Sequence, residues 1–427
     1  MNFLELKVNP SNPRRIKKEQ FEKLKKSIGS FTKMLEVRPI AYDEDGVIWG
    51  GNMRFEAIKA LGIEMKPEYF KELTGYTLEE KREFAIRDNV ELGEWDDDIL
   101  ANEWSDLPLD DWGVDVSGWD EEVVEDEAPE LSDEVVSKLG EVYQLGRHRL
   151  LCGDSTKIED VEKLMNGQKA DMVFTDPPYN VGYDYTVTYT EGRRKRTPYK
   201  AFDDSKSDVA FYEFLRDVFS NLFTNTKLEG AFYCWYATMN EHVVRASLVD
   251  SGWLVSQTLY WLKDRPTFSK GLDYLWITEP CYFGWHKGNK HFYNRKYRGD
   301  FNNIISLEYE DYNQLMNVLY EERENQMDYE HPTQKPCRLA ERAINRHCPR
   351  GGSVVDAFGG SGSTLIACEQ LDRTCYISEI DSKYVDVIIK RWVKFTGQRA
   401  YRIIDAEGKQ VKELVQFADE VFMESKK

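Results

Sequence analysis

The sequence has no closely paired cysteines and no long apolar run, and these absences exclude several classes of protein. The seven cysteines are scattered and none forms a CxxC pair, which argues against a zinc site and a disulfide framework. No apolar stretch approaches the roughly 18 residues of a membrane-spanning helix, and the first ten residues lack a secretory signal pattern. With 41% hydrophobic and 31% charged residues, the chain is expected to be globular, without a metal, and located in a reducing cytoplasm away from any membrane.

Basic residues are absent between Glu91 and Glu134, a stretch that holds 19 Asp or Glu. This stretch accounts for the whole net charge of −19, because the remaining residues hold 57 acidic and 57 basic side chains. A neutral remainder can carry the local basic face that DNA binding requires. Two interpretations of the stretch stay open: a solvated linker, or an internal mimic of DNA that covers a basic surface until DNA arrives.

Composition divides the chain into four parts. They are an N-terminal domain (residues 1–95), an acidic linker (96–138), a region rich in aromatic residues and short apolar runs (139–400) and a polar C-terminal tail (401–427). In the third part we expect strands at 171–175, 230–236, 353–356 and 374–378, and helices at 363–371 and 384–395. This order predicts an α/β fold with a mostly parallel sheet that helices cover on both faces.

A glycine-rich turn follows the expected strand 353–356 and reads Asp356-Ala357-Phe358-Gly359-Gly360-Ser361-Gly362-Ser363-Thr364. Its glycines let the backbone approach a ligand, and the next helix begins with free N–H groups. Glu379 follows about 20 residues later, where a carboxylate can accept both hydroxyls of a ribose. The spacing fits a dinucleotide or S-adenosylmethionine, and the order FGGSGST favours S-adenosylmethionine. Asp381 either contacts this ligand or caps the helix that begins near Lys383.

The tetrapeptide Asp176-Pro177-Pro178-Tyr179 ends the expected strand 171–175 and suits the methylation of a planar amino group. Such a nitrogen is a poor nucleophile because its lone pair is delocalised into the ring. The Asp176 carboxylate and the Pro177 carbonyl, which two prolines hold in place, can accept its two N–H bonds. Tyr179 offers a face on which a base can stack. No covalent intermediate is needed, so no cysteine is assigned as a nucleophile.

A basic run follows this tetrapeptide and consists of Arg193, Arg194, Lys195 and Arg196, together with Lys200. A target base in duplex DNA must be flipped out of the helix, and positive charge near the site offsets part of that cost. We interpret the run as a polar loop that contacts phosphates. A solvated run of charge is the alternative.

Residues 140–398 resemble the DNA amino-methyltransferases of the beta arrangement, in which the catalytic motif precedes the cofactor motif. Besides DPPY and FGGSGST, the resemblance rests on HRLLCGD (148–154), TEP (278–280), YFGWHKG (282–288) and HPTQKP (331–336). It implies a Rossmann-like fold that uses S-adenosylmethionine, with Lys335 at the methionine carboxylate. The DPPY form, rather than SPPY, favours adenine N6 over cytosine N4. The cofactor contacts expected in all are Asp154, Asp176, Thr333, Lys335, Asp356, Phe358, Gly359, Gly360, Ser361, Gly362, Thr364, Glu379 and Asp381.

Residues 1–95 resemble the ParB/sulfiredoxin-like N-terminal domain, a small α+β fold. The run GGNMRFEA (50–57) is close to that family's Gly-Glu-Arg-Arg box, but Asn52 and Met53 replace Glu and the first Arg, which argues against nucleotide hydrolysis. The run 87–89 resembles a second box. Such boxes bind nucleotide phosphates in parts of the family, so Gly51 and Arg54 are candidates to bind a phosphate of a nucleotide or of DNA. Pairing of Arg54 with a nearby carboxylate is the alternative.

The sequence thus predicts a site-specific adenine-N6 methyltransferase that acts on double-stranded DNA after base flipping, in a restriction-modification or phage setting. RNA, protein glutamine and cytosine N4 are alternative targets. The basic run and the motif order favour DNA over RNA and protein, and the DPPY form favours adenine over cytosine N4. A ParB-like DNA-binding regulator with an inactive methylase is the alternative from another class, and the intact motifs argue against it. A homodimer is compatible with the sequence.

Overall fold

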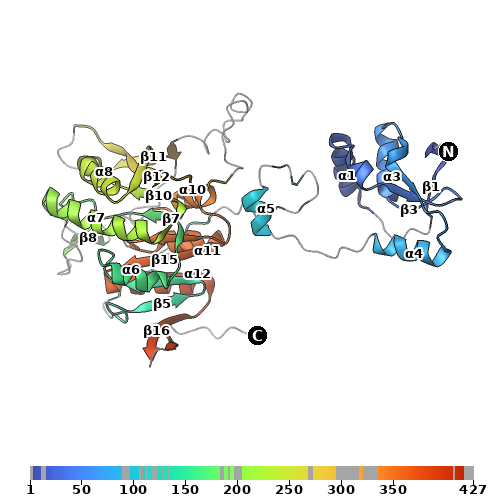
Figure 1. The fold of residues 1–427 in the computed structure, drawn as a ribbon. Coiled ribbons are helices and arrows are strands. Elements are labelled where there is room, and N and C mark those ends of the chain that lie inside the picture. The colour runs from blue at the N-terminus through green and yellow to red at the C-terminus, as the bar shows by residue number, and fades with distance from the viewer. Residues whose placement is uncertain are drawn as a thin grey trace. The chain divides into compact units, whose positions relative to one another are not determined.

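The computed structural model divides the chain into two compact units, Met1–Asp120 and Glu121–Lys427, each with a hydrophobic core (Figure 1). None of the helices in the described ranges is both long and apolar enough to cross a membrane. The structure describes residues 3–10, 16–88, 97–104, 107, 109–110, 114, 116, 123–126, 128–129, 131–132, 135–182, 187–190, 193–196, 204–267, 273–294, 317–320, 335–406 and 409–417.

The first unit is a small α+β structure, as its sequence predicts. Its four-stranded sheet has the order β1-β3-β2-β4, and Leu35, Ile48 and Phe55 lie in its core. The strands are β1 (Lys7–Val8), β2 (Ile40–Tyr42), β3 (Val47–Gly50) and β4 (Phe70–Glu72). The helices are η1 (Phe3–Glu5), α1 (Lys18–Ser30), α2 (Met34–Val37), α3 (Asn52–Leu61), η2 (Pro67–Tyr69), α4 (Leu78–Arg87) and α5 (Asp97–Glu103). The likeness to ParB stays a prediction.

The second unit is built on an eleven-stranded sheet with the order β13-β11-β12-β10-β7-β14-β15-β6-β5-β16-β17. Its five central strands, from β10 to β6, are parallel to one another. The strands are β5 (Val142–Leu145), β6 (His148–Cys152), β7 (Ala170–Thr175), β10 (Thr226–Trp235), β11 (Trp253–Thr267), β12 (Trp276–His286), β13 (Val318–Tyr320), β14 (Ser353–Asp356), β15 (Thr374–Glu379), β16 (Ala400–Ala406) and β17 (Lys409–Leu414).

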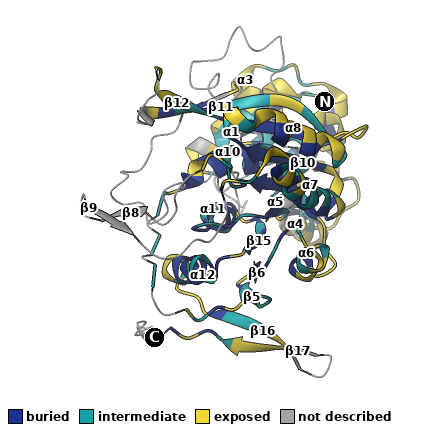
Figure 2. Ribbon diagram, turned by 90° about the vertical axis from the view of Figure 1, so that its left-hand side faces the viewer, coloured by how far each residue is buried: buried dark blue, intermediate teal, exposed yellow. Residues whose placement is uncertain are grey.

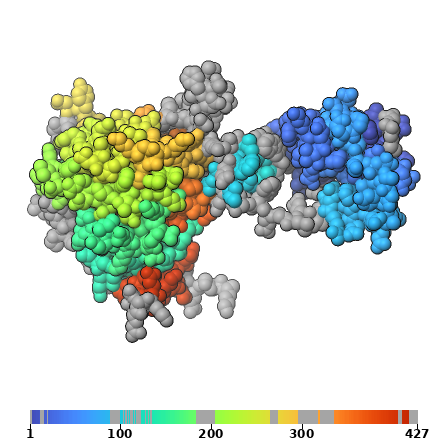
Figure 3. All heavy atoms as spheres, viewed as in Figure 1, coloured from blue at the N-terminus to red at the C-terminus, as the bar shows by residue number. Residues whose placement is uncertain are grey.

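Helices cover both faces of this sheet, because the central strands are apolar on both sides. In β7, Met172 and Phe174 belong to one core cluster and Val173 to the other. The helices on the first face are α10 (Cys337–His347), α11 (Ser363–Gln370) and α12 (Ser382–Thr396), and those on the second are α6 (Ile158–Met165), α7 (Asp208–Thr224) and α8 (Glu241–Asp250), with η3 (Thr238–Asn240) before α8. Figure 2 colours the buried sheet residues dark blue, and in Figure 3 the segment around α7 and α8, in green and yellow-green, covers the sheet on the viewer's side.

The expected strands and helices around the glycine-rich turn are confirmed, but the mostly parallel sheet is not. In the eleven-stranded sheet, every described pair outside the central five strands except β11–β13 is antiparallel. Short connections explain part of this antiparallel pairing, because two neighbouring strands joined by a few residues can only run antiparallel. Gly146 and Arg147 join β5 to β6 in this way, and Gly146 has a φ of +57° that suits such a turn.

Two predicted boundaries also differ from the structure. The polar tail does not start at residue 401, because β16 pairs with β5 and β17, and Phe417 is buried in the core. The acidic linker is also not wholly a linker, since Val123 is fully buried in the core of the second unit. Val123 in the acidic stretch and Phe417 in the tail supply buried apolar contacts that the polar composition of the two segments conceals.

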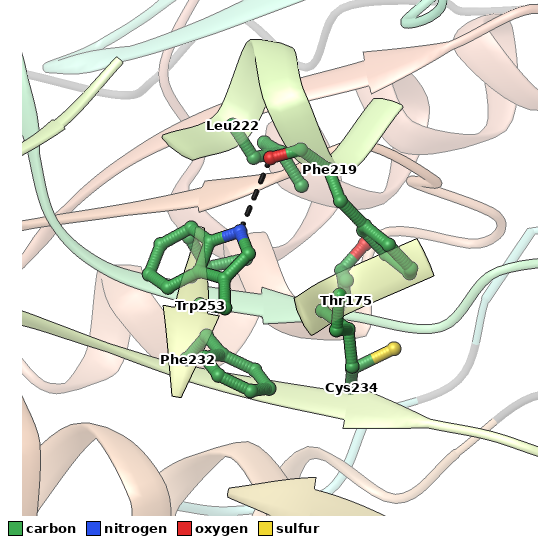
Figure 4. Close-up of a pocket in the computed structure, with 8 residues that line it drawn as sticks. Thr175, Phe219, Leu222, Phe232, Cys234 and Trp253 are labelled. Atoms are coloured by element: carbon green, nitrogen blue, oxygen red, sulfur yellow. Dashed lines mark hydrogen bonds between the residues drawn. The ribbon is translucent and has the colours of Figure 1, made fainter. Parts of the chain in front are cut away.

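A small apolar void lies between the sheet and the helices on its second face (Figure 4). The Trp253 indole donates to the Phe219 carbonyl at 3.1 Å beside it. Its lining residues are Val173, Thr175, Phe219, Leu222, Phe232, Cys234, Leu248 and Trp253. Because none of them is charged, we interpret the void as a packing feature and not as the functional site.

Candidate active site

Four predicted site carboxylates lie at one edge of the sheet. Asp154 follows β6, Asp176 follows β7, Asp356 ends β14 and Glu379 ends β15. These strands are mutually parallel neighbours in the sheet, so their carboxyl ends meet at the same edge. In open α/β sheets, ligands bind in the crevice outside this edge.

The glycine-rich turn is held in place by Asp356 itself. One carboxylate oxygen accepts the Thr175 hydroxyl and the Phe358 N–H, both at 3.1 Å, and the other accepts the Thr364 hydroxyl at 2.7 Å. Burial raises the pKa of Asp356 to about 7, although these hydrogen bonds oppose the rise. The hydrogen bonds of Asp356 therefore fix the shape of the turn. A direct contact between Asp356 and the cofactor stays a prediction.

Two glycines of this turn need their conformational freedom. Gly360 has a φ of +51°, and Gly362, directly before α11, has a φ of +87°. A Cβ atom on Gly362 would lie 3.2 Å from Ile388, whereas one on Gly360 would meet no atom of the described residues within 4 Å. The backbone at Gly360 therefore faces open space, as the approach of a ligand requires.

Glu379 is bonded to the same turn. Its carboxylate accepts the Gly360 N–H at 2.8 Å and the Asp381 N–H at 2.9 Å, and burial raises its pKa to about 7. Each carboxylate oxygen keeps a further lone pair, so the group can still accept two hydroxyl donors. Asp381 accepts the Lys383 N–H at 2.9 Å as the cap of α12, which is one of its two predicted roles.

The Asp154 segment lies beside the turn. Asp154 accepts the Thr156 N–H at 3.0 Å and the Thr156 hydroxyl at 2.7 Å, which fixes the bend after β6. The next residue, Ser155, donates to the Ala357 carbonyl at 3.0 Å. The Asp154 segment and the glycine-rich turn are therefore neighbours, as expected. A contact between the Asp154 side chain and the cofactor stays a prediction.

The DPPY tetrapeptide contains a buried acceptor without a donor. The Asp176 Oδ1 atom is buried and has no hydrogen-bond partner among the described residues, while Oδ2 accepts Lys335 Nζ at 2.5 Å. Burial raises the pKa of the Asp176 carboxyl, although Lys335 opposes the rise. A buried acceptor without a donor is costly, so this atom is suited to a polar group that a ligand brings.

Tyr179 is held by its hydroxyl and by the backbone. The hydroxyl donates to Glu279 Oε1 at 2.5 Å and accepts from Lys335 Nζ at 2.9 Å. The Asn240 amide donates to the Tyr179 carbonyl at 2.6 Å. The ring therefore has a fixed orientation next to Asp176, as a stacking surface requires.

Two residues that the sequence analysis gave no role, Glu279 and Lys263, complete a charged cluster. Glu279 Oε2 accepts Lys263 Nζ at 2.6 Å, and Glu279 Oε1 lies 2.9 Å from Lys335 Nζ. Burial acts to raise the pKa of Glu279, but the two ammonium groups lower it well below its usual range. Burial acts to lower the pKa of Lys335, but Asp176 and Glu279 raise it overall. The cluster is thus two carboxylates balanced by two ammonium groups.

One sequence signal could have indicated this cluster. Glu279 is a charged residue within an otherwise largely aromatic and apolar strand sequence, and such charges are rarely buried unless they are paired. Lys263 gives no such signal, because Asp264 and Arg265 follow it directly. Lys335 was expected at a methionine carboxylate, whereas its described contacts are with the DPPY aspartate, Tyr179 and Glu279.

The structure describes four of the five basic residues that were predicted to contact DNA. Arg193–Arg196 form strand β9, which pairs antiparallel with β8 (Val187–Thr190), so these four residues are not in an irregular loop. Lys200 and Thr333 lie outside the described residues. The contact of β9 with phosphates stays a prediction.

In the first unit, Arg54 lies in the first turn of α3. Its Nη2 atom donates to the Pro39 carbonyl at 3.4 Å, and its buried Nε atom has no hydrogen-bond partner within the described ranges. Gly51 has a φ of +81°, and a Cβ there would lie 2.9 Å from the Arg54 guanidinium. Burial lowers the pKa of Arg54, and the Asp88 carboxylate opposes this change electrostatically. Phosphate binding by Arg54 stays a prediction.

These features define an α/β unit with a ligand-binding edge and a DPPY site beside it. Residues 170–391 match the model of the DNA methylase family of N6 and N4 enzymes, and the chain belongs to that family. It is therefore a DNA methyltransferase.

Its relatives include type II methyltransferases. M.HpaI of Haemophilus parainfluenzae is 25% identical over 251 residues, which cover 57% of this chain and 73% of the relative. M2.DpnII of Streptococcus pneumoniae is 24% identical over 230 residues, covering 53% and 84%. Among solved structures, the M1.HpyAVI–SAM complex is 20% identical and covers 57% of this chain and 97% of that one, with a TM-score of 0.39. The cytosine-N4-specific PvuII DNA methyltransferase is 16% identical, covering 58% and 87%, with a TM-score of 0.42.

Proposed function

We propose that this protein transfers a methyl group from S-adenosylmethionine to the N6 atom of adenine in duplex DNA. The observation that carries the proposal is the Asp176 Oδ1 atom beside the fixed ring of Tyr179, a buried acceptor to which no described residue donates. An adenine that stacks on Tyr179 brings an amino group, which is the kind of donor that this atom lacks.

The residues at the sheet edge fit the cofactor. Glu379 has free lone pairs for the two ribose hydroxyls, and the open backbone at Gly360 leaves room beside it. Asp154 and the turn from Asp356 to Thr364 lie around the same place. When it is bound there, S-adenosylmethionine supplies an electrophilic methyl group on a sulfonium.

The chain's own residues prepare the amino nitrogen. Asp176 Oδ1 and the Pro177 carbonyl accept its two N–H bonds, which draws the nitrogen lone pair out of conjugation with the ring. The nitrogen becomes positively charged on methylation and must lose a proton. Asp176 Oδ1 is suited to accept this proton, because burial raises its pKa. The fixed tyrosine ring limits the motion of the base, so less entropy is lost on approach to the methyl group.

Contacts with DNA are assigned to the basic strand β9. Each of Arg193–Arg196 carries a positive charge that can neutralise a backbone phosphate, and β9 lies in the chain between DPPY and α7. Such contacts offset part of the cost of flipping the base, which is a few kcal/mol.

Adenine is favoured over cytosine by the residue that opens the tetrapeptide. Asp176 is an anionic acceptor that can also take up a proton, whereas a serine at this position would offer a neutral hydroxyl. The N4 atom of cytosine is the competing target, because it is the same type of exocyclic amino group.

Incorporation of labelled methyl groups tests the proposal. The full chain is incubated with labelled S-adenosylmethionine and duplex DNA, RNA or protein, and the DNA is then digested to nucleosides for mass spectrometry. We expect the label in N6-methyladenine. Label in N4-methylcytosine would contradict the adenine assignment, and label only in RNA or protein would overturn the assignment to DNA.

A further inference from the structure

Part of the acidic stretch belongs to the second unit and packs against its helices. We call residues 123–126 the acidic strap. Val123 is fully buried, its N–H donates to the Glu341 carboxylate at 3.2 Å, and Val124 exchanges two hydrogen bonds with the Gln370 amide, at 2.8 and 2.9 Å. These are specific contacts with α10 and α11, which a solvated linker would not make.

The last residue of the strap is connected to the glycine-rich turn through one buried arginine. Asp126 accepts Arg391 Nη2 at 2.5 Å and Arg391 Nε at 2.9 Å, a two-bond pairing. The remaining Arg391 nitrogen, Nη1, donates to the Ser361 carbonyl at 3.0 Å and to the Ser363 hydroxyl at 3.3 Å. Arg391 is only 1% exposed, so its guanidinium depends on protein groups such as these for its hydrogen bonds.

The strap residue before it holds the start of α10. Glu125 accepts the Cys337 N–H and the Arg338 N–H, both at 2.9 Å. No side chain from α10's own N-cap residue, Pro336, satisfies these donors. The first-turn N–H groups of a helix need outside acceptors, and an anion there is stabilised by the helix dipole. Because Lys335 lies two residues before Cys337, Glu125 also fixes the chain that places Lys335 at Asp176.

We propose that Glu125 and Asp126 are positioning residues for methyl transfer. Asp126 acts through Arg391 to hold the glycine-rich turn, and Glu125 acts through α10 to hold Lys335 at the DPPY site. This inference rests on the proposed function, since it assigns the turn to the cofactor and DPPY to the reacting base. Asp126→Asn removes the charged partner of the buried Arg391, and Glu125→Ala removes an acceptor of the Cys337 and Arg338 N–H groups, so either change weakens a contact between the strap and the site.

The two residues are expected to affect different kinetic constants. In the full chain, Asp126→Asn should raise KM for S-adenosylmethionine roughly 3- to 30-fold, the range of coupling through a shared network, with a smaller effect on kcat. Glu125→Ala should lower kcat by a similar factor and change this KM less, because Lys335 contacts the DPPY site. A loss of folding alone would lower kcat in each variant in proportion to its own unfolded fraction and would leave KM unchanged. The kcat of each variant is therefore expressed per mole of protein that binds S-adenosylmethionine in calorimetry, so that the fall expected for Glu125→Ala is a property of the folded enzyme.

A matched control is available at the other end of the sheet. Arg402 makes a two-bond pair with Glu413, at 2.6 and 3.2 Å, on the β16–β17 hairpin. Glu413→Gln breaks a pair of the same chemistry and should leave both constants unchanged. The thermal midpoint of each variant and calorimetric binding of S-adenosylmethionine complete the measurement.

The outcomes separate the two proposals. A wild-type protein that methylates DNA, with strap variants whose KM and kcat match those of Glu413→Gln, would overturn the positioning roles and leave the proposed function intact. A wild-type protein that neither binds S-adenosylmethionine nor methylates DNA would overturn both. A raised KM in Asp126→Asn together with a lowered kcat in Glu125→Ala would support the inference.

Discussion

Replacement of Glu279 by glutamine is expected to damage both stability and turnover, although Glu279 lies outside the DPPY motif. Its carboxylate accepts Lys263 Nζ at 2.6 Å, lies 2.9 Å from Lys335 Nζ and accepts the Tyr179 hydroxyl at 2.5 Å. In Glu279→Gln, Asp176 remains as the only carboxylate of the cluster for the two ammonium groups.

The size of the effect follows from burial. Lys335 and Lys263 are 8% and 6% exposed, and loss of one partner from a buried ion pair costs about 3–5 kcal/mol. Glutamine keeps one oxygen acceptor, so we expect a loss of about 2–3 kcal/mol in the free energy of unfolding. For a unit of this size, with an unfolding entropy of about 2.1 cal/mol/K per residue, that corresponds to a fall of roughly 3–5 °C in Tm. Lys335 should then bind Asp176 more strongly and lower the pKa of its carboxyl, so that Asp176 accepts the proton of the substrate amino group less readily, which should lower kcat about 100-fold.

Thermal unfolding and steady-state methylation of duplex DNA measure these two effects. Glu413→Gln is the control, because its pair with Arg402 is half-exposed and such pairs contribute about 0–1 kcal/mol. If Glu279→Gln kept the wild-type Tm and kcat, the charged cluster would have neither of the roles given to it.

Three further predictions address other parts of the site. Alanine at all four positions of Arg193–Arg196 should weaken DNA binding and reduce the slope of log affinity against log salt, measured by fluorescence anisotropy; an unchanged slope would favour the solvated run of charge. The affinity for S-adenosylmethionine, measured by calorimetry, should fall roughly tenfold for each pH unit below about 7. Glu379 must be ionised to accept the ribose hydroxyls, and burial raises its pKa to about 7. An affinity that does not change between pH 6 and pH 8 would contradict this prediction. Gly362→Ala should destabilise the second unit by about 1–2 kcal/mol in urea unfolding, because φ is +87° and Ile388 is 3.2 Å from the new Cβ; unchanged stability would refute that argument.

The central sheet could be predicted from the sequence because its signals are local. Strands β7, β14 and β15 are short apolar runs that end in recognisable turns, and each lies within a residue of its expected range. The antiparallel flanks could not be predicted, because strand order depends on pairings between segments far apart in the chain. The position of β16 beside β5 is one such pairing.

The site was predictable where a motif carries it and not where only the fold brings residues together. Asp176, Asp356 and Glu379 each end a parallel strand, so their common edge follows from topology. Lys263 lies 16 residues from Glu279 on a neighbouring antiparallel strand, and no spacing in the sequence marks that contact. The pairing of Asp126 with Arg391 spans 265 residues and was hidden in a stretch whose composition resembles a linker.

Single-molecule sequencing of DNA from cells that express this chain tests the central claim most directly, because it reports the modified base and its context together. The account predicts N6-methyladenine at one recurring sequence context, and none in cells that express Asp176→Ala. Unmodified adenine with the wild-type chain, or the same modification with Asp176→Ala, would contradict it.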